Sequence, residues 1–139
     1  MSNFSLMILC AGFGKRMLDL TTNKPKPLLI YKNKTLLENT LSFFKGIGCN
    51  KFIVNTHYLH NIIEDYINNK LKNYSISIIN EPIILGTGGG IKNAFNYISE
   101  DKLCVVNCDI FWQKENKFEV INFIRNHNDD DKCRMLLSN

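Results

Sequence analysis

The sequence contains no apolar run that approaches the ~20 residues of a membrane-spanning helix. The longest run, at residues 6–11, has only the length of a β-strand. Residues 1–3, which precede it, carry no basic side chain, so a secretory signal peptide is not expected either. We therefore expect a cytoplasmic protein that has no membrane partner.

Cysteine pairs with metal-binding spacing are also absent. The five cysteines include no C-x-x-C pair, their number is odd, and no zinc-ligand spacing is present. The simplest interpretation is a set of buried or partly buried thiols in a reducing cytoplasm.

A basic stripe with interleaved aromatic side chains, which is typical of nucleic-acid binding, is missing as well. The lysines are scattered along the chain, and the formal net charge is only +4. Nucleic acid is therefore not an expected partner, although a mild positive charge is compatible with a small anionic ligand.

The sequence does have the composition of a globular domain, with 45% hydrophobic and 22% charged residues, and its length suits one domain over residues 1–139. Thr35 and Glu38 have the spacing of a capping box at the start of a helix, and segment 19–27, with two prolines, is expected to be a loop. Short apolar runs predict strands at 6–10, 51–55, 75–79, 103–107 and 135–137. Helical spacing of apolar residues predicts helices at 36–44, 59–67, 91–98 and 118–125.

Strands that alternate with helices at short intervals indicate an α/β fold with a mostly parallel sheet flanked by helices. Ligands of such sheets bind at the carboxyl ends of the strands. Three segments at those ends are candidate sites: 12–16, 86–90 and 107–109.

The first candidate combines Gly12 and Gly14 with Arg16. Glycines let backbone N–H groups approach phosphate oxygens, and a guanidinium can hold a phosphate through two parallel hydrogen bonds. A Walker A motif is absent, and Met17 stands where a dinucleotide fingerprint needs its third glycine. On its own, the segment also fits an ordinary turn between a strand and a helix.

Three further segments carry chemistry that suits a nucleotide. Prolines on both sides of Lys26 stiffen the backbone and can aim one ammonium group at a phosphate, or the lysine is simply solvated. The consecutive glycines at 88–90 leave room for a flat base, or they form a flexible loop. Asp109 follows a buried strand, as a Mg²⁺ ligand does, or it caps a turn.

The four segments together resemble the sugar-1-phosphate nucleotidyltransferase family. Their order, L-x-A-G-x-G-x-R-M, K-P-K-P-L, G-T-G-G-G-I and N-x-D, matches that family from residue 6 to residue 109. Segments 55–59, 88–90 and 107–112 are most similar to the N-acetylmuramate 1-phosphate uridylyltransferase group. The loop at 85–89 also matches the L-G-T-x-G loop of mannose- and heptose-1-phosphate guanylyltransferases, so the choice of base stays open.

The resemblance implies a Rossmann-like fold and transfer of a nucleotidyl group from a nucleoside triphosphate, with UTP favoured, to a sugar 1-phosphate. Pyrophosphate is released and a nucleotide sugar is formed. The attacking phosphate oxygen is already anionic, so no general base is needed, and catalysis depends on positioning and charge neutralisation. The implied roles are a nucleotide pocket at Ala11, Gly12 and Gly14, pyrophosphate binding at Arg16, α-phosphate binding at Lys26, base binding at Gly88 and Gly89, and Mg²⁺ binding at Asp109.

The chains of that family are longer than this sequence, and the part beyond residue 139 carries most of their sugar site and a second metal-binding aspartate. Three hypotheses follow from this difference. The chain is the N-terminal portion of a transferase, or a nucleotide-binding fragment of a split gene with a separately encoded C-terminal portion, or a non-enzymatic α/β module with a vestigial pocket. In the first two, its partners are a nucleoside triphosphate and a sugar 1-phosphate.

The remaining polar candidates have ordinary structural interpretations. His57 lies at a strand end, where it contacts the nucleotide or sugar or else packs the turn beside Tyr58. His60 and His127 are expected at the surface, and residues 129–131, three aspartates, are expected to form a solvated turn and no metal cluster.

Overall fold

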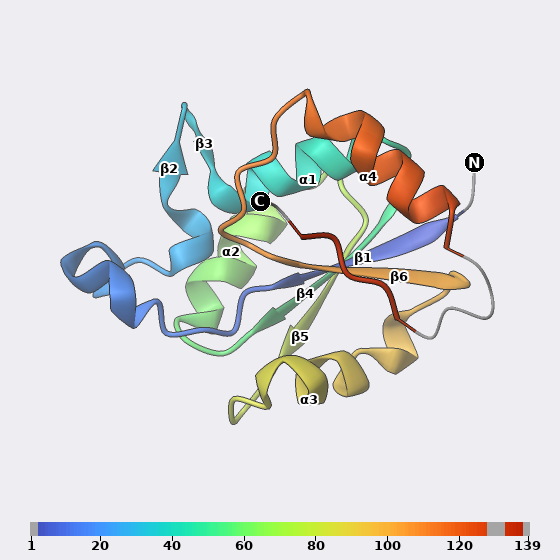
Figure 1. Cartoon of the computed structure of the whole chain (residues 1–139). Coiled ribbons are helices and arrows are strands. Elements are labelled where there is room, and N and C mark those ends of the chain that lie inside the picture. Colours follow the sequence, from blue (N-terminus) through green and yellow to red (C-terminus); the bar gives the residue numbers. More distant parts are fainter. Residues whose placement is uncertain (1–2, 128–132, 138–139) are drawn as a thin grey trace.

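A four-stranded parallel sheet organises the chain. The computed structural model describes residues 3–127 and 133–137, except the side chain of Leu18. The strands are β1 (Phe4–Leu9), β4 (Lys51–Thr56), β5 (Ile76–Asn80) and β6 (Lys102–Asn107), in the order β5-β4-β1-β6 (Figure 1). The α/β class with a parallel sheet is confirmed.

Helices cover both faces of this sheet. They are α1 (Leu36–Lys45), α2 (His60–Lys70), α3 (Gly86–Asn93) and α4 (Asn116–Arg125). Side chains of α1, α2 and α4 share one apolar cluster with Leu6 and Ile8 of β1, whereas Met7 packs with Ile91 on the face of α3. Alternate residues of a strand point to opposite faces of the sheet. A strand with helices on both faces therefore needs apolar residues at successive positions, and β1 has such a run.

The start of α1 agrees with the capping box. The Glu38 N–H donates to Thr35 Oγ1 at 3.1 Å, and the Thr35 N–H donates to Glu38 Oε2 at 2.7 Å. The helix ends at Lys45 with Gly46 as its C-cap, and Gly48 follows in the left-handed region, with φ at 102°. Both ends of α1 were therefore predictable, because Thr35 and Glu38 accept hydrogen bonds from backbone N–H groups at its start and glycines follow its last turn.

Short elements replace the loop expected at 19–27. The 3-10 helices η1 (Lys15–Thr21) and η2 (Lys26–Leu28) enclose an irregular stretch, and a third, η3 (Phe95–Tyr97), follows α3. Strands β2 (Ile30–Tyr31) and β3 (Lys34–Thr35) form a hairpin. Its two turn residues, Lys32 and Asn33, have φ values of 48° and 65°, as a tight hairpin turn requires.

Two predictions were wrong. The consecutive glycines do not precede a helix but belong to α3, which begins at Gly86 and ends before the predicted limit at residue 98. No strand forms at 135–137, where Met135 and Leu137 are largely exposed and the backbone joins no sheet. An apolar run becomes a strand only where another strand pairs with it, and none of the described strands pairs with these residues.

Two remaining expectations concern the surface. No helix among the described residues is both long and apolar enough to span a bilayer. The three aspartates at 129–131 lie outside the described residues.

Candidate functional site

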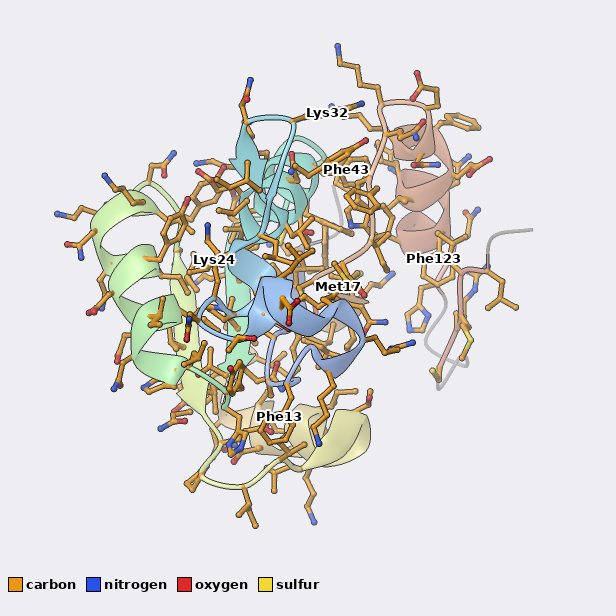
Figure 2. All side chains as sticks on the ribbon, turned by 90° about the vertical axis from the view of Figure 1, so that its left-hand side faces the viewer. Phe13, Met17, Lys24, Lys32, Phe43 and Phe123 are labelled. Carbon is orange, nitrogen blue, oxygen red and sulfur yellow. The ribbon has the colours of Figure 1, made fainter. Side chains whose placement is uncertain are left out.

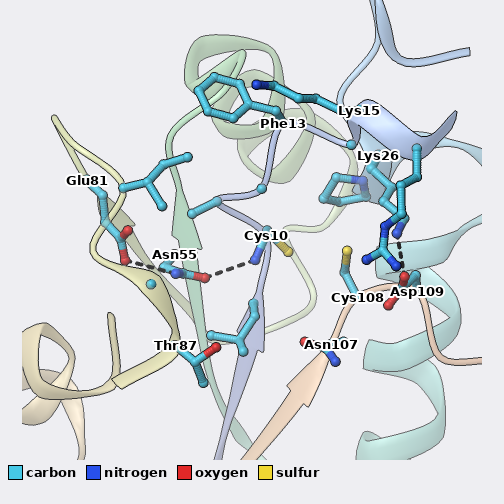
Figure 3. Close-up of a pocket in the computed structure, with 18 residues that line it drawn as sticks. Cys10, Phe13, Lys15, Lys26, Asn55, Glu81, Thr87, Asn107, Cys108 and Asp109 are labelled. Carbon is cyan, nitrogen blue, oxygen red and sulfur yellow. Dashed lines mark hydrogen bonds and ion pairs between the residues drawn. The ribbon is translucent and has the colours of Figure 1, made fainter. Parts of the chain in front are cut away.

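The three candidate segments meet around one pocket of about 500 Å³ at the carboxyl ends of the parallel strands (Figure 3). Leu9, the last residue of β1, lies opposite both Asn55 of β4 and Asn107 of β6. The loops that follow these strands therefore begin at the same level of the sheet. The pocket is lined by residues 9–16, 26–27, 55, 81, 84, 86–87 and 107–109.

The first loop presents open backbone to the pocket. A Cβ at Gly12 would meet no atom within 4 Å, so the backbone there is accessible to a ligand. Gly14 has a different role, since its φ is 68° and a Cβ would lie 3.0 Å from the Thr21 side chain. The Thr21 hydroxyl donates to the Gly14 carbonyl at 3.1 Å and closes the turn. Ala11 also lines the pocket and is buried.

Aromatic contacts hold this loop against the end of β4. The Phe13 ring lies 5.5 Å from His57, edge to face, and 5.6 Å from Tyr58. The Tyr58 hydroxyl donates to the carbonyls of Thr21 and Thr22, so the turn after β4 fixes both ends of the segment. Figure 2 shows this segment, with Phe13, Met17 and Lys24 labelled, on the side that faces the viewer.

The contacts of His57 agree with the second interpretation, in which this residue packs the turn after β4. Its Nδ1 forms a hydrogen bond of 2.6 Å with the Glu81 carbonyl, and the residue is not among those that line the pocket. His60 is less exposed than expected, because Thr56 Oγ1 lies 2.8 Å from its Nδ1 and Glu64 Oε2 lies 3.2 Å from its Nε2.

Three charged side chains predicted for phosphate and metal chemistry lie in the pocket wall. Arg16 is exposed and forms no ion pair with any described residue. Lys26 forms an ion pair with Asp109, in which 19% of the lysine side chain and 39% of the aspartate side chain is exposed. Pro25 and Pro27 are both buried, which fixes the backbone that carries Lys26.

The donor set at this end of the pocket suits Mg²⁺ held jointly with a substrate. Among the described residues, no group of three or more histidine, cysteine or acidic side chains could hold a metal by itself. Asp109 offers one carboxylate. Asn107 also lines the pocket, and Figure 3 shows both side chains. Mg²⁺ commonly takes one or two carboxylates and completes its octahedron with phosphate oxygens and water.

The glycine-rich segment contributes through its first residues. Gly86, with φ at 69°, and Thr87 line the pocket together with Ile84. Gly88 and Gly89 lie further along α3 and are not among the lining residues. Gly88 and Gly89, which were predicted to bind the base, therefore lie next to the pocket. Gly86 and Thr87 are the residues of this glycine-rich segment that line it.

Two polar residues that the motifs did not assign connect these walls. Asn55 Oδ1 accepts a hydrogen bond from the Cys10 N–H at 2.9 Å, and Asn55 Nδ2 donates to Glu81 Oε1 at 2.9 Å. Glu81 Oε2 accepts from the Leu85 N–H at 3.2 Å. Glu81 stands just past an apolar strand, which is the same signal that identified Asp109 and which could have identified it too.

The cysteines agree with the expectation of buried thiols, except Cys133, which is exposed. Burial, reinforced by a hydrogen bond with Cys108, raises the pKa of the Cys10 thiol well above its ordinary value. Burial likewise raises the pKa of Cys104 to about 12. The Cys10 thiol, which lines the pocket, therefore stays protonated and uncharged at neutral pH and adds no negative charge to it.

Comparison with known proteins gives consistent matches. The sequence model of a family described as nucleotidyl transferase matches residues 5–137. A D-glycero-alpha-D-manno-heptose 1-phosphate guanylyltransferase of Aneurinibacillus thermoaerophilus is 35% identical over 103 residues, which are 74% of this chain and 45% of that protein. An N-acetylmuramate alpha-1-phosphate uridylyltransferase of Caulobacter vibrioides is 34% identical over 110 residues, 76% of this chain and 46% of that protein.

A solved structure agrees with the sequence matches. HddC from Yersinia pseudotuberculosis, complexed with GMP-PN, superposes with a TM-score of 0.69 at 30% identity, covering 85% of this chain and 53% of that one. The chain thus spans about half the length of the curated relatives it matches.

Proposed function

The chain belongs to the nucleotidyl transferase family, and from this premise we propose that its pocket binds a nucleoside triphosphate for transfer to a sugar 1-phosphate. In this reaction an oxygen of the sugar phosphate forms a bond to the α-phosphorus. The bond from that phosphorus to the bridging oxygen breaks, and pyrophosphate leaves with the electron pair. The products are a nucleotide sugar and pyrophosphate.

The observation that carries the proposal is the meeting of Arg16, Lys26 and Asp109 with the open backbone of the first loop in one pocket. Arg16 would hold the β- and γ-phosphates and neutralise the leaving pyrophosphate. Lys26 would exchange Asp109 for the α-phosphate, where negative charge grows as the new bond forms. The backbone at Gly12 would approach the phosphates closely, since no side chain intervenes.

Asp109 would hold Mg²⁺, with Asn107 as a neighbouring oxygen donor. When bound, the ion would supply positive charge against the phosphate oxygens. The proposed roles of Lys26 and Asp109 are compatible with their pairing, because a phosphate and a cation would each replace the charge that the other partner supplies.

The opposite end of the pocket would receive the base. Gly86 and Thr87 line it, and Gly88 and Gly89 lie behind them in α3. We propose uridine as the base, because segments 55–59, 88–90 and 107–112 resemble the uridylyltransferase group. Guanosine is the second candidate, supported by the guanylyltransferase of Aneurinibacillus and by the bound GMP-PN of the HddC structure.

The matched region covers about half the length of its relatives, so nucleotide binding and turnover need separate tests. Binding would require only the described pocket. Turnover would require the sugar site, which we propose is supplied by a C-terminal portion, either continuous with this chain or separately encoded.

Thermal unfolding with Mg²⁺ and each of UTP, GTP, CTP, dTTP and ATP tests the proposal. A nucleotide at 100 times its dissociation constant stabilises a protein by about 2.7 kcal/mol, which raises the melting temperature of a domain this size by several degrees. We expect one nucleotide to act selectively and its effect to be strongly reduced in Arg16→Ala. No stabilisation by any of the five would contradict the proposal and favour a vestigial pocket.

A further inference from the structure

Glu81 is a buried acidic side chain whose position the proposed chemistry does not explain. The residue is 1% exposed and forms no ion pair with any described residue. Burial of a carboxyl group is costly unless hydrogen bonds replace its hydration. Its own N–H donates to the Thr56 carbonyl at 2.8 Å, which anchors its backbone to β4.

The carboxyl group of Glu81 is one link in a relay of hydrogen bonds across three strands. From the Cys10 N–H at the end of β1, the relay passes through both ends of the Asn55 amide to Glu81 Oε1. It continues from Glu81 Oε2 to the Leu85 N–H, directly before α3. Figure 3 shows the first two bonds as dashed lines. The relay therefore joins the backbone of the first loop to the start of the glycine-rich helix.

Helix α3 packs directly against this relay. A Cβ at Gly90 would lie 2.9 Å from Glu81 Oε1 and 3.1 Å from Asn55 Nδ2, closer than a side chain tolerates. Gly90 is buried, so the helix backbone itself contacts the relay at this point. The helix is thus attached twice, by a hydrogen bond at Leu85 and by close packing at Gly90.

The relay also lies in the wall of the pocket, because Cys10, Asn55 and Glu81 are all lining residues. In Figure 3 Asn55, Glu81 and Thr87 lie on one side of the pocket, and Lys26 and Asp109 lie on the other. The relay thus connects the first loop, at Cys10, with the start of α3, at Leu85, and we expect the base between these two segments.

We propose that Asn55 and Glu81 are positioning residues, which set the spacing between the first glycine loop and the start of α3 and so shape the base-binding end of the pocket. This inference rests on the proposed function, because it needs a nucleotide in the pocket. It assigns no direct contact with the base to either residue.

Each hydrogen-bond donor along the relay faces an acceptor, and a double substitution can test this pairing. An asparagine offers one acceptor and one donor, and a carboxylate offers two acceptors. Asn55→Asp places two acceptors face to face, and Glu81→Gln places an amide donor against one of its two donor neighbours. The combination Asn55→Asp with Glu81→Gln reverses the middle hydrogen bond and restores a donor for every acceptor.

The experiment compares the wild-type chain, both single variants and the double variant by calorimetric titration with each of the five nucleotides in Mg²⁺. All measurements are made well below the lowest melting temperature. For the nucleotide that the wild type binds, we expect each single variant to weaken binding at least about tenfold. The double variant is expected to recover most of that loss. Asn50→Asp and Glu119→Gln make the same chemical changes at exposed positions and should leave binding unchanged.

The outcomes separate the two proposals. A wild-type chain that binds none of the nucleotides overturns the proposed function and this role with it. A wild-type chain that binds, with folded single variants that bind equally well or a double variant no better than the worse single variant, overturns the relay alone. If a single variant does not fold, the double variant decides: a folded, binding protein supports the relay, and an unfolded one overturns it.

Discussion

Lys26 and Asp109 lie 83 residues apart in the sequence and form an ion pair in the wall of the pocket. The lysine is held by the proline-stiffened segment and the aspartate by the turn after β6, so two separate parts of the chain determine their proximity. A bound triphosphate would compete with Asp109 for the ammonium group while its own charge attracts a cation to the carboxylate. The first prediction concerns this exchange.

Asp109→Asn should remove the effect of Mg²⁺ on nucleotide affinity. The amide keeps the shape of the side chain but loses the charge that a hard cation prefers. Titration of the preferred nucleotide with and without Mg²⁺ should show a gain of about tenfold or more in the wild type and little gain in the variant. Glu119→Gln serves as the control, and an undiminished Mg²⁺ effect in Asp109→Asn would contradict the assignment.

Arg16→Ala should weaken binding of a triphosphate and spare the monophosphate of the same base. The guanidinium is proposed to contact only the phosphates that leave as pyrophosphate, and a charge-assisted pair of this kind contributes ~1.5–3 kcal/mol. Titrations with UTP and UMP, or with GTP and GMP, check the ratio of affinities. Lys24→Ala removes an exposed charge outside the pocket and should change neither value. Equal losses for both nucleotides would instead indicate general damage to the loop.

Gly90→Ala and Gly88→Ala should have opposite effects on stability. Alanine is the better helix former by ~1 kcal/mol, and a Cβ at Gly88 meets no atom within 4 Å. At Gly90 the Cβ would meet Glu81 Oε1 at 2.9 Å, so overpacking should outweigh the propensity gain and destabilise the chain by ~1–3 kcal/mol. Urea unfolding without nucleotide measures both. Equal stabilisation by the two substitutions would show that α3 does not press on the relay.

Alkaline pH should destabilise the chain through its buried thiols. Burial raises the pKa of Cys49 from 9.0 to about 11 and that of Cys104 to about 12. The folded chain thus keeps protons that the unfolded chain releases, and this stabilisation is complete below pH 9.0 and is lost as the pH rises through the folded-state values. Urea unfolding over this range should show a shallower decline for the Cys49→Ala, Cys104→Ala double variant than for the wild type. Parallel curves would mean that other groups cause the loss.

The sequence predicts those elements whose causes are local or periodic. Strand β1 follows from an uninterrupted apolar run, and α1 follows from the Thr35–Glu38 capping box together with its apolar spacing. The first loop and Asp109 were placed at the pocket by the rule that strand ends carry ligands, and Gly12 and Asp109 do lie there.

Features that depend on tertiary contacts escaped prediction. Three glycines in a row have poor helix propensity, yet they form part of α3, where Gly90 is required by the closeness of Glu81 and Asn55. The partners of Glu81 lie on β4 and at the start of α3, and no spacing in the sequence indicates them. Residues 135–137 have the apolar character of a strand but pair with no strand among the described residues.

The register that sets Leu9 opposite both Asn55 and Asn107 makes the chain tolerant of insertions at one end of the sheet and intolerant at the other. Extra residues between Lys72 and Asn73, which are both exposed in the turn before β5, would lengthen that turn and leave the pocket unchanged. One extra residue between Leu9 and Gly12 would shift the first loop against its neighbours on both sides. A peptide tag or a fluorescent reporter therefore belongs between Lys72 and Asn73.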